Sequence, residues 1–189
     1  MKKIFTLFAI MFFSLSLLAQ EHLDFRGVPI DGQLDDFVVK MESMGYTVKK
    51  RDGNIVIMEG QFTNRDAELW IVSSNQTKTV WKVIVDFSKS SSWSSLKNSY
   101  FEYKDLYIKK YGSNNKSYEF FSKPYYEGDG YELQALRKDK CTYATFFINE
   151  NGTIAVKLTR FENLQIGYED KINGDKSSKE KTSSALDEI

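Results

Sequence analysis

The sequence predicts an α+β protein in which two separate helices pack on one face of an antiparallel sheet. Two segments, 34–44 and 93–111, place apolar residues at helical spacing, and each is followed by about four strand-like segments. The dipeptides Asp52-Gly53 and Asn151-Gly152 are hairpin-turn signals that join neighbouring strands as antiparallel pairs. Runs of antiparallel strands with few helices indicate a layered α+β fold.

The order of these elements repeats along the chain. We expect a single domain over residues 20–170, made of two helix-plus-four-strand units at about 30–88 and 92–170. The simplest packing places one helix from each half on the same face of the sheet. Residues 171–189 lack a pattern that could pack, and they are predicted to form a disordered tail.

The first helix is indicated by apolar residues spaced i, i+3, i+4 and i+7. Asp31 is placed to cap it, with Asp35 and Asp36 in its first turn. The three acids could instead bind a cation, but capping and the helix dipole explain their spacing. Gly45 stands where a helix end favours a left-handed residue. Strand-like segments follow at 47–51, 54–59, 67–73 and 79–87.

The second helix carries a stripe of tyrosines. Tyr100, Tyr103 and Tyr107 continue from Leu96 at spacings of 4, 3 and 4 residues. Such a stripe can be a recognition face or the buried side of a helix. Because a lone helix on a sheet must bury one stripe, we expect these rings to pack inward with their hydroxyls at the rim. Strand-like segments follow at 117–122, 130–137, 141–148, 153–161 and 164–169.

The N-terminus, residues 1–19, has the pattern of a secretory signal peptide. Lys2 and Lys3 precede an apolar run that ends in small residues at Ala19. The run is about 15 residues long, shorter than the roughly 20 that a spanning helix needs. We therefore expect cleavage after Ala19 rather than retention as an anchor, and no membrane span in the mature protein. No cysteine lies near this site, so we expect a periplasmic or extracellular protein that is not a lipoprotein.

Charge and cysteine content exclude two classes of protein. The chain has 26 basic and 26 acidic side chains, and loss of the two signal lysines leaves two acids in excess. A nucleic-acid partner is therefore not expected, because such proteins normally carry a basic patch. Cys141 is the only cysteine, so no intrachain disulfide can form and the core must hold the fold. Its strand context predicts a buried, inert thiol.

Several separated motifs resemble a family of small exported proteins of Bacteroides and its relatives. They cover nearly the whole mature chain up to Asn173: EHLDFRGVPIDGQLDDFVVKMESMGY, VWKVIVDF, WSSLKNSYFEYKDLYIKKYG and IGYEDKIN. The resemblance implies an exported protein, but it implies no activity, cofactor or site residue. Members of that family often have more than one cysteine, unlike this chain. The order of elements is also similar to the architecture of β-lactamase inhibitory protein, a likeness of fold that does not fix function.

No residue pattern identifies a catalytic or metal centre. His22 is the only histidine and lies close to the predicted mature end, where a preorganised general base is not expected. One histidine and one cysteine cannot build a zinc site. The segment Glu127-Gly128-Asp129-Gly130 lacks the ligand spacing of a calcium loop. We therefore expect no catalytic residue, no metal site and no cofactor.

The binding candidates are aromatic side chains outside the tyrosine stripe. Tyr125 and Tyr126 adjoin a Gly-rich turn, where loop tyrosines could stack on a sugar or peptide, or could pack a strand end. Phe101 lies on a flank of the second helix, where it could widen the buried stripe or form an exposed patch.

The function that these patterns favour is an exported binding or interaction module for a protein or glycan, and not an enzyme. One alternative is a carboxylate-dependent hydrolase of glycans, which requires two acids facing each other roughly 5–10 Å apart. Another is an assembly partner, which would present an unpaired sheet edge or a large apolar patch.

Overall fold

The computed structural model describes residues 21–189, which fold into an α+β structure with an eight-stranded antiparallel sheet and a separate two-stranded sheet. The predicted signal peptide and its cleavage site lie outside the described residues. The helices are α1 (Leu34–Ser43), α2 (Trp93–Tyr111), α3 (Glu132–Arg137) and α4 (Lys171–Asp187). The strands are β1 (Asp24–Phe25), β2 (Val28–Pro29), β3 (Thr47–Asp52), β4 (Ile55–Phe62), β5 (Arg65–Ser73), β6 (Val80–Phe87), β7 (Asn115–Phe121), β8 (Cys141–Ile148), β9 (Gly152–Leu158) and β10 (Leu164–Asp170).

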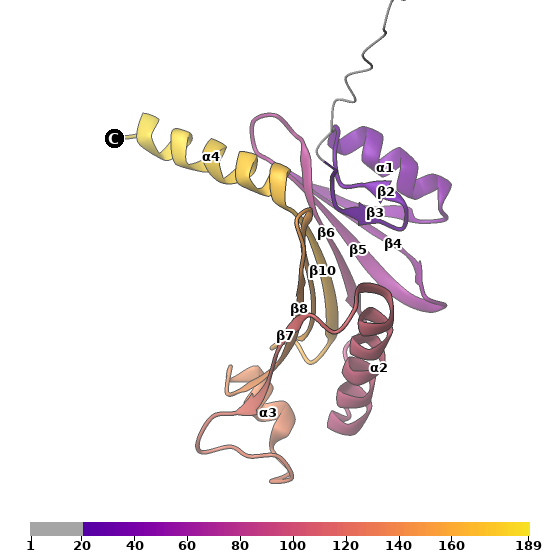
Figure 1. Cartoon of the computed structure of the whole chain (residues 1–189), viewed down its shortest axis with the longest axis vertical. Helices are drawn as coiled ribbons and strands as arrows, with labels where there is room; N and C mark the ends of the chain where they lie inside the picture. Colours follow the sequence, from indigo (N-terminus) through magenta and orange to yellow (C-terminus); the bar gives the residue numbers. More distant parts are fainter. Residues whose placement is uncertain (1–20) are drawn as a thin grey trace, which may run out of the picture.

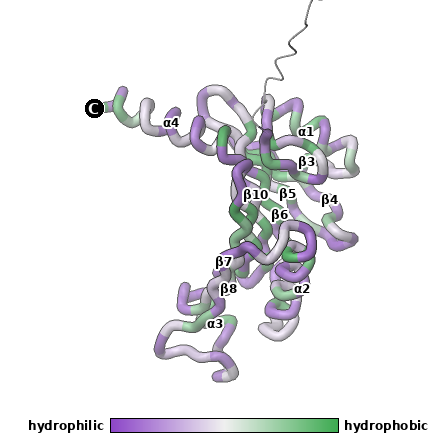
Figure 2. The backbone as a smooth tube through the Cα atoms, viewed as in Figure 1, coloured by the Kyte–Doolittle hydropathy of each residue, from purple (hydrophilic) through white to green (hydrophobic). Residues whose placement is uncertain are grey.

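The large sheet has the order β3-β4-β5-β6-β10-β9-β8-β7, and every neighbouring pair is antiparallel. Its middle pair joins β6 to β10, two strands distant in sequence, with Val85 opposite Ile166. Side chains alternate along the strands, so one face buries its apolar residues and the other is partly exposed. Figure 2 shows the hydrophobic residues (green) concentrated on the middle strands.

Helices α1 and α2 cover the same buried face, α1 over β5 and α2 over β8, β9 and β10 (Figure 1). Helix α1 presents Phe37, Val38 and Met41 to the sheet, at the spacing that the sequence predicts. Helix α4 projects away from the sheet on the opposite side (Figure 1). No helix among residues 21–189 combines the length and apolarity needed to cross a membrane.

The tyrosine stripe of α2 is buried, as the helical spacing predicts. Tyr100, Tyr103 and Tyr107 are all in the core. Each hydroxyl has a side-chain partner: Tyr100 lies 2.6 Å from the Thr145 hydroxyl and donates to Glu119, Tyr103 meets Thr63, and Tyr107 meets Tyr168. The hydroxyl contacts of Tyr100 with Thr145 and of Tyr107 with Tyr168 are buried and do not lie at the rim, where the sequence placed them. A buried hydroxyl must be paired to avoid a desolvation cost, and each of these has a partner.

The segment expected to be a disordered tail contains helix α4. Its first turn is held by Asp170, whose side chain accepts a hydrogen bond from the backbone N–H of Asn173 at 2.8 Å. The other carboxylate oxygen of Asp170 accepts from the N–H of Leu23 at 2.8 Å, and His22 Nδ1 lies 3.1 Å from it. These partners are distant in the sequence, so the polar pattern of the helix itself did not reveal them.

Two other local expectations differ from the structure. Segment 130–137 was expected as a strand, but Glu132–Arg137 forms α3 and buries Ala135 and Leu136, because its composition favours helix. Asp31 does not cap α1; Gln33 occupies that position without a side-chain hydrogen bond. Asp31 accepts from Asn173 instead; partial burial opposes its ionisation, but this bond, the Gly32 N–H and nearby His22 lower its pKa.

Candidate functional site

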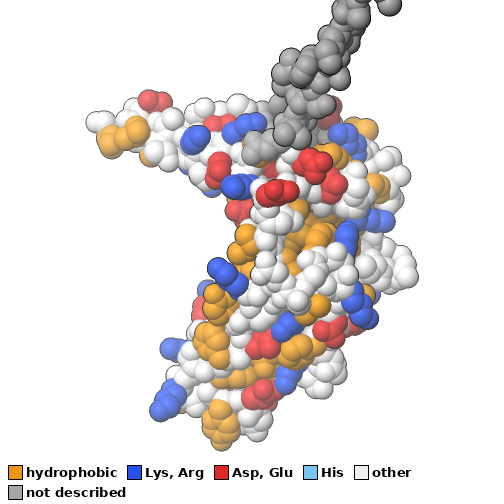
Figure 3. Space-filling model, viewed as in Figure 1, with side chains coloured by type: hydrophobic (Ala, Val, Ile, Leu, Met, Phe, Trp, Pro, Cys, Tyr) orange, Lys and Arg blue, Asp and Glu red, His pale blue; other side chains and the backbone are white. Residues whose placement is uncertain are grey.

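A groove of about 840 Å³ lies between α2, the β4–β5 hairpin and the residues that directly follow α1. Figure 3 shows hydrophobic side chains (orange) at the bottom of a hollow between the parts of the molecule that carry these helices. The volume is in the range of small-molecule sites in proteins. The residues that line the groove are Arg26, Met44, Gly45, Gly60, Gln61, Phe62, Thr63, Asn64, Tyr103, Leu106, Tyr107, Lys110 and Tyr168.

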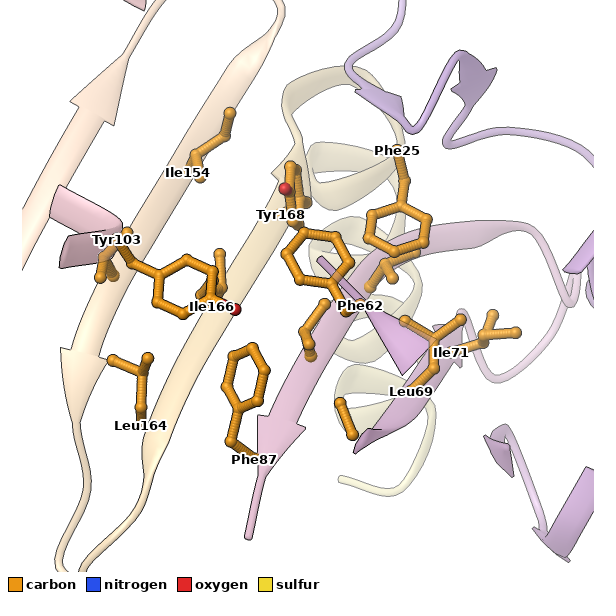
Figure 4. Close-up of a cluster of buried hydrophobic side chains, with 14 of the residues drawn as sticks. Phe25, Phe62, Leu69, Ile71, Phe87, Tyr103, Ile154, Leu164, Ile166 and Tyr168 are labelled. Atoms are coloured by element: carbon orange, nitrogen blue, oxygen red, sulfur yellow. The ribbon is translucent and has the colours of Figure 1, made fainter. Parts of the chain in front are cut away.

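The floor of the groove is a continuous set of aromatic rings. Phe62, at the end of β4, stacks on Tyr103 with ring centroids 6.4 Å apart, and Tyr168 from β10 lies 6.3 Å from Tyr107. Phe25 contacts both Phe62 and Tyr168. Figure 4 shows several of these rings lying side by side above the sheet. Interlocked aromatic pairs form a rigid apolar surface, because each ring is held by its neighbours.

Gly60 shapes one wall of the groove. A Cβ atom at this position would lie 2.6 Å from Cδ1 of Tyr46, so only glycine lets the Tyr46 ring lie across β4. The Tyr46 hydroxyl donates to the carbonyl of Gln61 at 3.1 Å and accepts from Nη1 of Arg26 at 3.2 Å. The ring therefore connects the wall to Arg26 at the rim.

The charges on the groove are all positive. Arg26 comes from the β1–β2 turn and Lys110 from the last turn of α2, and the described lining includes no aspartate or glutamate. Neither cation makes an ion pair with a carboxylate of residues 21–189. The groove thus combines an apolar floor with two cations at its edge.

The phenol groups of the floor are neutral. Burial raises the pKa of Tyr103, and burial raises the pKa values of Tyr107 and Tyr168 further. Their hydroxyls serve as hydrogen-bond donors and acceptors rather than as anions. The floor therefore adds no negative charge to the groove.

The three binding residues that the sequence suggested lie elsewhere. Tyr126 is 65% exposed in the loop after β7, while Tyr125 packs against the core and its hydroxyl accepts from Gln134 at 3.1 Å. Phe101 packs against the core beside Tyr100, with ring centroids 5.2 Å apart. None of the three lines the groove. Their roles in recognition stay predictions.

The sequence did not point to the groove, although it contained one signal. The groove joins the β1–β2 turn, the end of α1, the β4–β5 hairpin, α2 and β10. The tyrosine stripe was predicted to pack against the sheet, and two of its members, Tyr103 and Tyr107, also form part of the floor of the groove. Arg26, Met44 and Lys110 meet only through the tertiary fold, so no local spacing linked them.

A second hollow, of about 960 Å³, lies on the other face of the sheet and contains the residues most relevant to a hydrolase. Glu68 and Asp86 are direct cross-strand partners there, so they stand side by side rather than opposed. Burial raises the pKa of Asp86, although it accepts hydrogen bonds from Asn163 and Gln165. Glu68 pairs with Lys49 at 2.5 Å. The carboxylates of Asp86 and Glu68 are thus each bound by neighbouring side chains of the protein.

The remaining chemically distinctive residues have structural surroundings. Cys141 is buried, and burial together with Glu127 and Glu132 raises the pKa of its thiol to about 12. His22, expected to be at a mobile end, lies between Asp31 and the buried Asp170. Asp129, in the Gly-rich turn, accepts from the N–H groups of Tyr126 and Tyr131, as a turn-forming aspartate does.

The fold and the groove together define an α+β protein with a ligand-sized site between two helices on one face of an antiparallel sheet. Comparisons with protein-family models, with curated proteins and with solved structures found no match to this chain.

Proposed function

We propose that this protein is an exported binding module that holds an amphipathic ligand in the groove between α1 and α2. The observation that carries the proposal is the aromatic floor of Phe62, Tyr103, Tyr107 and Tyr168 in a groove of about 840 Å³. Concave sites with apolar linings and a few polar groups are the usual places for small ligands. The floor belongs to the core, so the site is preformed and binding requires little ordering.

Leu106→Glu should weaken binding of a neutral apolar probe. Leu106 is 44% exposed and lines the groove from α2, so a carboxylate there makes the entrance polar without disturbing the core. We expect the Kd for N-phenyl-1-naphthylamine, measured by fluorescence enhancement, to rise at least about tenfold.

The matched control is Val39→Glu, a similar change on the exposed side of α1 and outside the groove. This variant should bind the probe like the unmodified protein. Equal binding by the Leu106 and Val39 variants, or no binding by the unmodified protein, would remove the groove as the ligand site.

A second candidate function, assembly through strand addition, is favoured by the outer edge of β7. Within residues 21–189 no strand pairs with this edge, and Tyr118 and Phe120 on it are about half exposed. The other outer strand, β3, carries Lys49, Lys50 and Arg51 and a register irregularity, features that discourage edge pairing.

Under this alternative the protein self-associates at β7, and Phe120→Lys should make it monomeric, because a lysine on an edge strand opposes pairing. Size-exclusion chromatography with light scattering measures the mass of both proteins. A monomeric unmodified protein at high concentration would count against assembly and leave the binding proposal in place.

The hydrolase alternative has weaker support. It requires two opposed carboxylates with room for a sugar between them, whereas Glu68 and Asp86 are neighbours on one sheet face with amide and lysine partners. We therefore propose a non-catalytic role.

The proposal includes an architecture of two halves, about 30–88 and 92–170. It is supported by the sheet order, in which β3–β6 and β7–β10 occupy opposite sides and meet at the β6–β10 pair. The likeness to the exported family of Bacteroides, and to the layout of β-lactamase inhibitory protein, is part of the same proposal. Export and release into the periplasm or the exterior follow from the signal pattern of residues 1–19.

A further inference from the structure

We propose that the ligand of the groove is a single-chain carboxylate amphiphile, a fatty acid, with its carboxylate at Arg26 and Lys110 and its alkyl chain on the aromatic floor. This inference rests on the proposed function and specifies the ligand. It is carried by the distribution of charge in the groove, where two cations lie at the rim of an otherwise uncharged lining.

Arg26 is held in position by the turn that carries it. Arg26 and Gly27 have φ angles of 52° and 82°, the conformation of a two-residue hairpin turn between β1 and β2. Phe25, next to the turn, is fully buried and anchors it to the core. The guanidinium lies 5.8 Å from the centroid of the Tyr46 ring and donates to the Tyr46 hydroxyl. The arginine is therefore preorganised at the groove.

The guanidinium of Arg26 has N–H donors that remain available for a ligand. Its hydrogen bonds to the Tyr46 hydroxyl and the Gln61 carbonyl both use Nη1. A guanidinium has five N–H donors in a planar fork that matches a carboxylate, so donors remain for an anion. An arginine beside neutral partners keeps its positive charge uncompensated, which favours an anionic ligand.

Lys110 provides the second cation from α2. Its Nζ lies 5.0 Å from the centroid of the Tyr111 ring, on the same helix as the floor residues Tyr103 and Tyr107. Lys110 therefore lines the groove from α2, whereas Arg26 lines it from the β1–β2 turn. A ligand that satisfies both features has an anionic head and an apolar body.

The number of charges and the size of the groove narrow the chemical class of the ligand. Two exposed cations match one carboxylate better than a densely charged polyanion, which would need a wider basic patch. A volume of about 840 Å³ is that of a drug-sized site, which fits one alkyl chain. Leu106 and Met44 flank the entrance and extend the apolar surface.

The test compares two ligands that differ only in the head group. Oleate and oleyl alcohol are each used, below the concentration at which they aggregate, to displace N-phenyl-1-naphthylamine from the exported protein. We expect oleate to bind about tenfold more tightly than the alcohol, because the charged head gains charge-assisted hydrogen bonds. Arg26→Gln and Lys110→Gln should each reduce this preference several-fold, because each removes one of the two cations that face the carboxylate.

Lys109→Gln is the matched control, since it removes a neighbouring lysine of α2 that does not line the groove. This variant should keep the full preference for oleate. If oleate and oleyl alcohol displace the probe equally, the carboxylate proposal fails and the groove remains a binding site for neutral apolar ligands. Displacement by neither ligand also overturns it, and failure of the probe itself to bind overturns the proposed function.

Discussion

Replacing Tyr103 with alanine should lower the free energy of unfolding by about 3–5 kcal/mol, the range for removing a large buried aromatic side chain. Tyr103 is 1% exposed, and its ring lies 5.1 Å from that of Phe87 and 6.4 Å from that of Phe62. Its removal leaves a cavity where α2 meets the sheet. A loss of this size should lower the melting temperature by roughly 10 °C in thermal unfolding followed by circular dichroism.

Two variants separate packing from the hydroxyl and from general surface effects. Tyr103→Phe keeps the ring and loses only the hydrogen bond with Thr63, so it should cost about 1 kcal/mol. Tyr131→Ala, at a position 60% exposed, should stay within about 0.5 kcal/mol of the unmodified protein. An unchanged melt for Tyr103→Ala would show that the tyrosine stripe does not stabilise the fold.

Replacing Asp170 with alanine should cost about 3 kcal/mol or more. The side chain is fully buried, caps α4 through the N–H of Asn173 and accepts from the N–H of Leu23. Alanine removes the helix cap and leaves buried N–H groups without a partner. It also removes the carboxylate that lies 3.1 Å from Nδ1 of His22. We expect the melting temperature to fall by several degrees and α4 to lose protection against hydrogen exchange.

The matched control for this change is Asp175→Ala on the same helix. Asp175 is exposed, so its loss should have little effect on the melting temperature. Asp170→Asn keeps an oxygen that accepts one of the two hydrogen bonds and should fall between the two variants. Identical melts for the Asp170 and Asp175 alanine variants would mean that this buried carboxylate is not a structural link.

Asp170 and Asn173 also explain why the prediction of a disordered C-terminal tail was wrong. Asn173 is buried, and its side-chain amide lies within hydrogen-bond distance of the carbonyls of Ile30 and Val80. The start of α4 is therefore joined to the N-terminal segment and to β6. A helix whose own sequence is polar gains its order from such distant partners, and local pattern alone does not reveal them.

The candidate site also combines features that local sequence predicts with features that only the fold creates. The tyrosine spacing in α2 predicted which rings face the sheet, and the structure confirms their burial. The groove above them depends on where α1 ends, on the bare backbone of Gly60 beneath Tyr46, and on the turn that presents Arg26. These three features belong to separate segments of the chain, so the site forms only when the fold brings those segments together.

The sequence by itself determined the α+β class, the two main helices with their buried faces and the hairpins at Asp52-Gly53 and Asn151-Gly152, because helical and strand periods and turn dipeptides are local properties of a chain. Tertiary structure alone decided the pairing of β6 with β10, the formation of α4 and the groove with its two cations. The physical reason is that hydrogen bonds and packing between residues far apart in the chain depend on the completed fold, and they leave no regular spacing in the sequence.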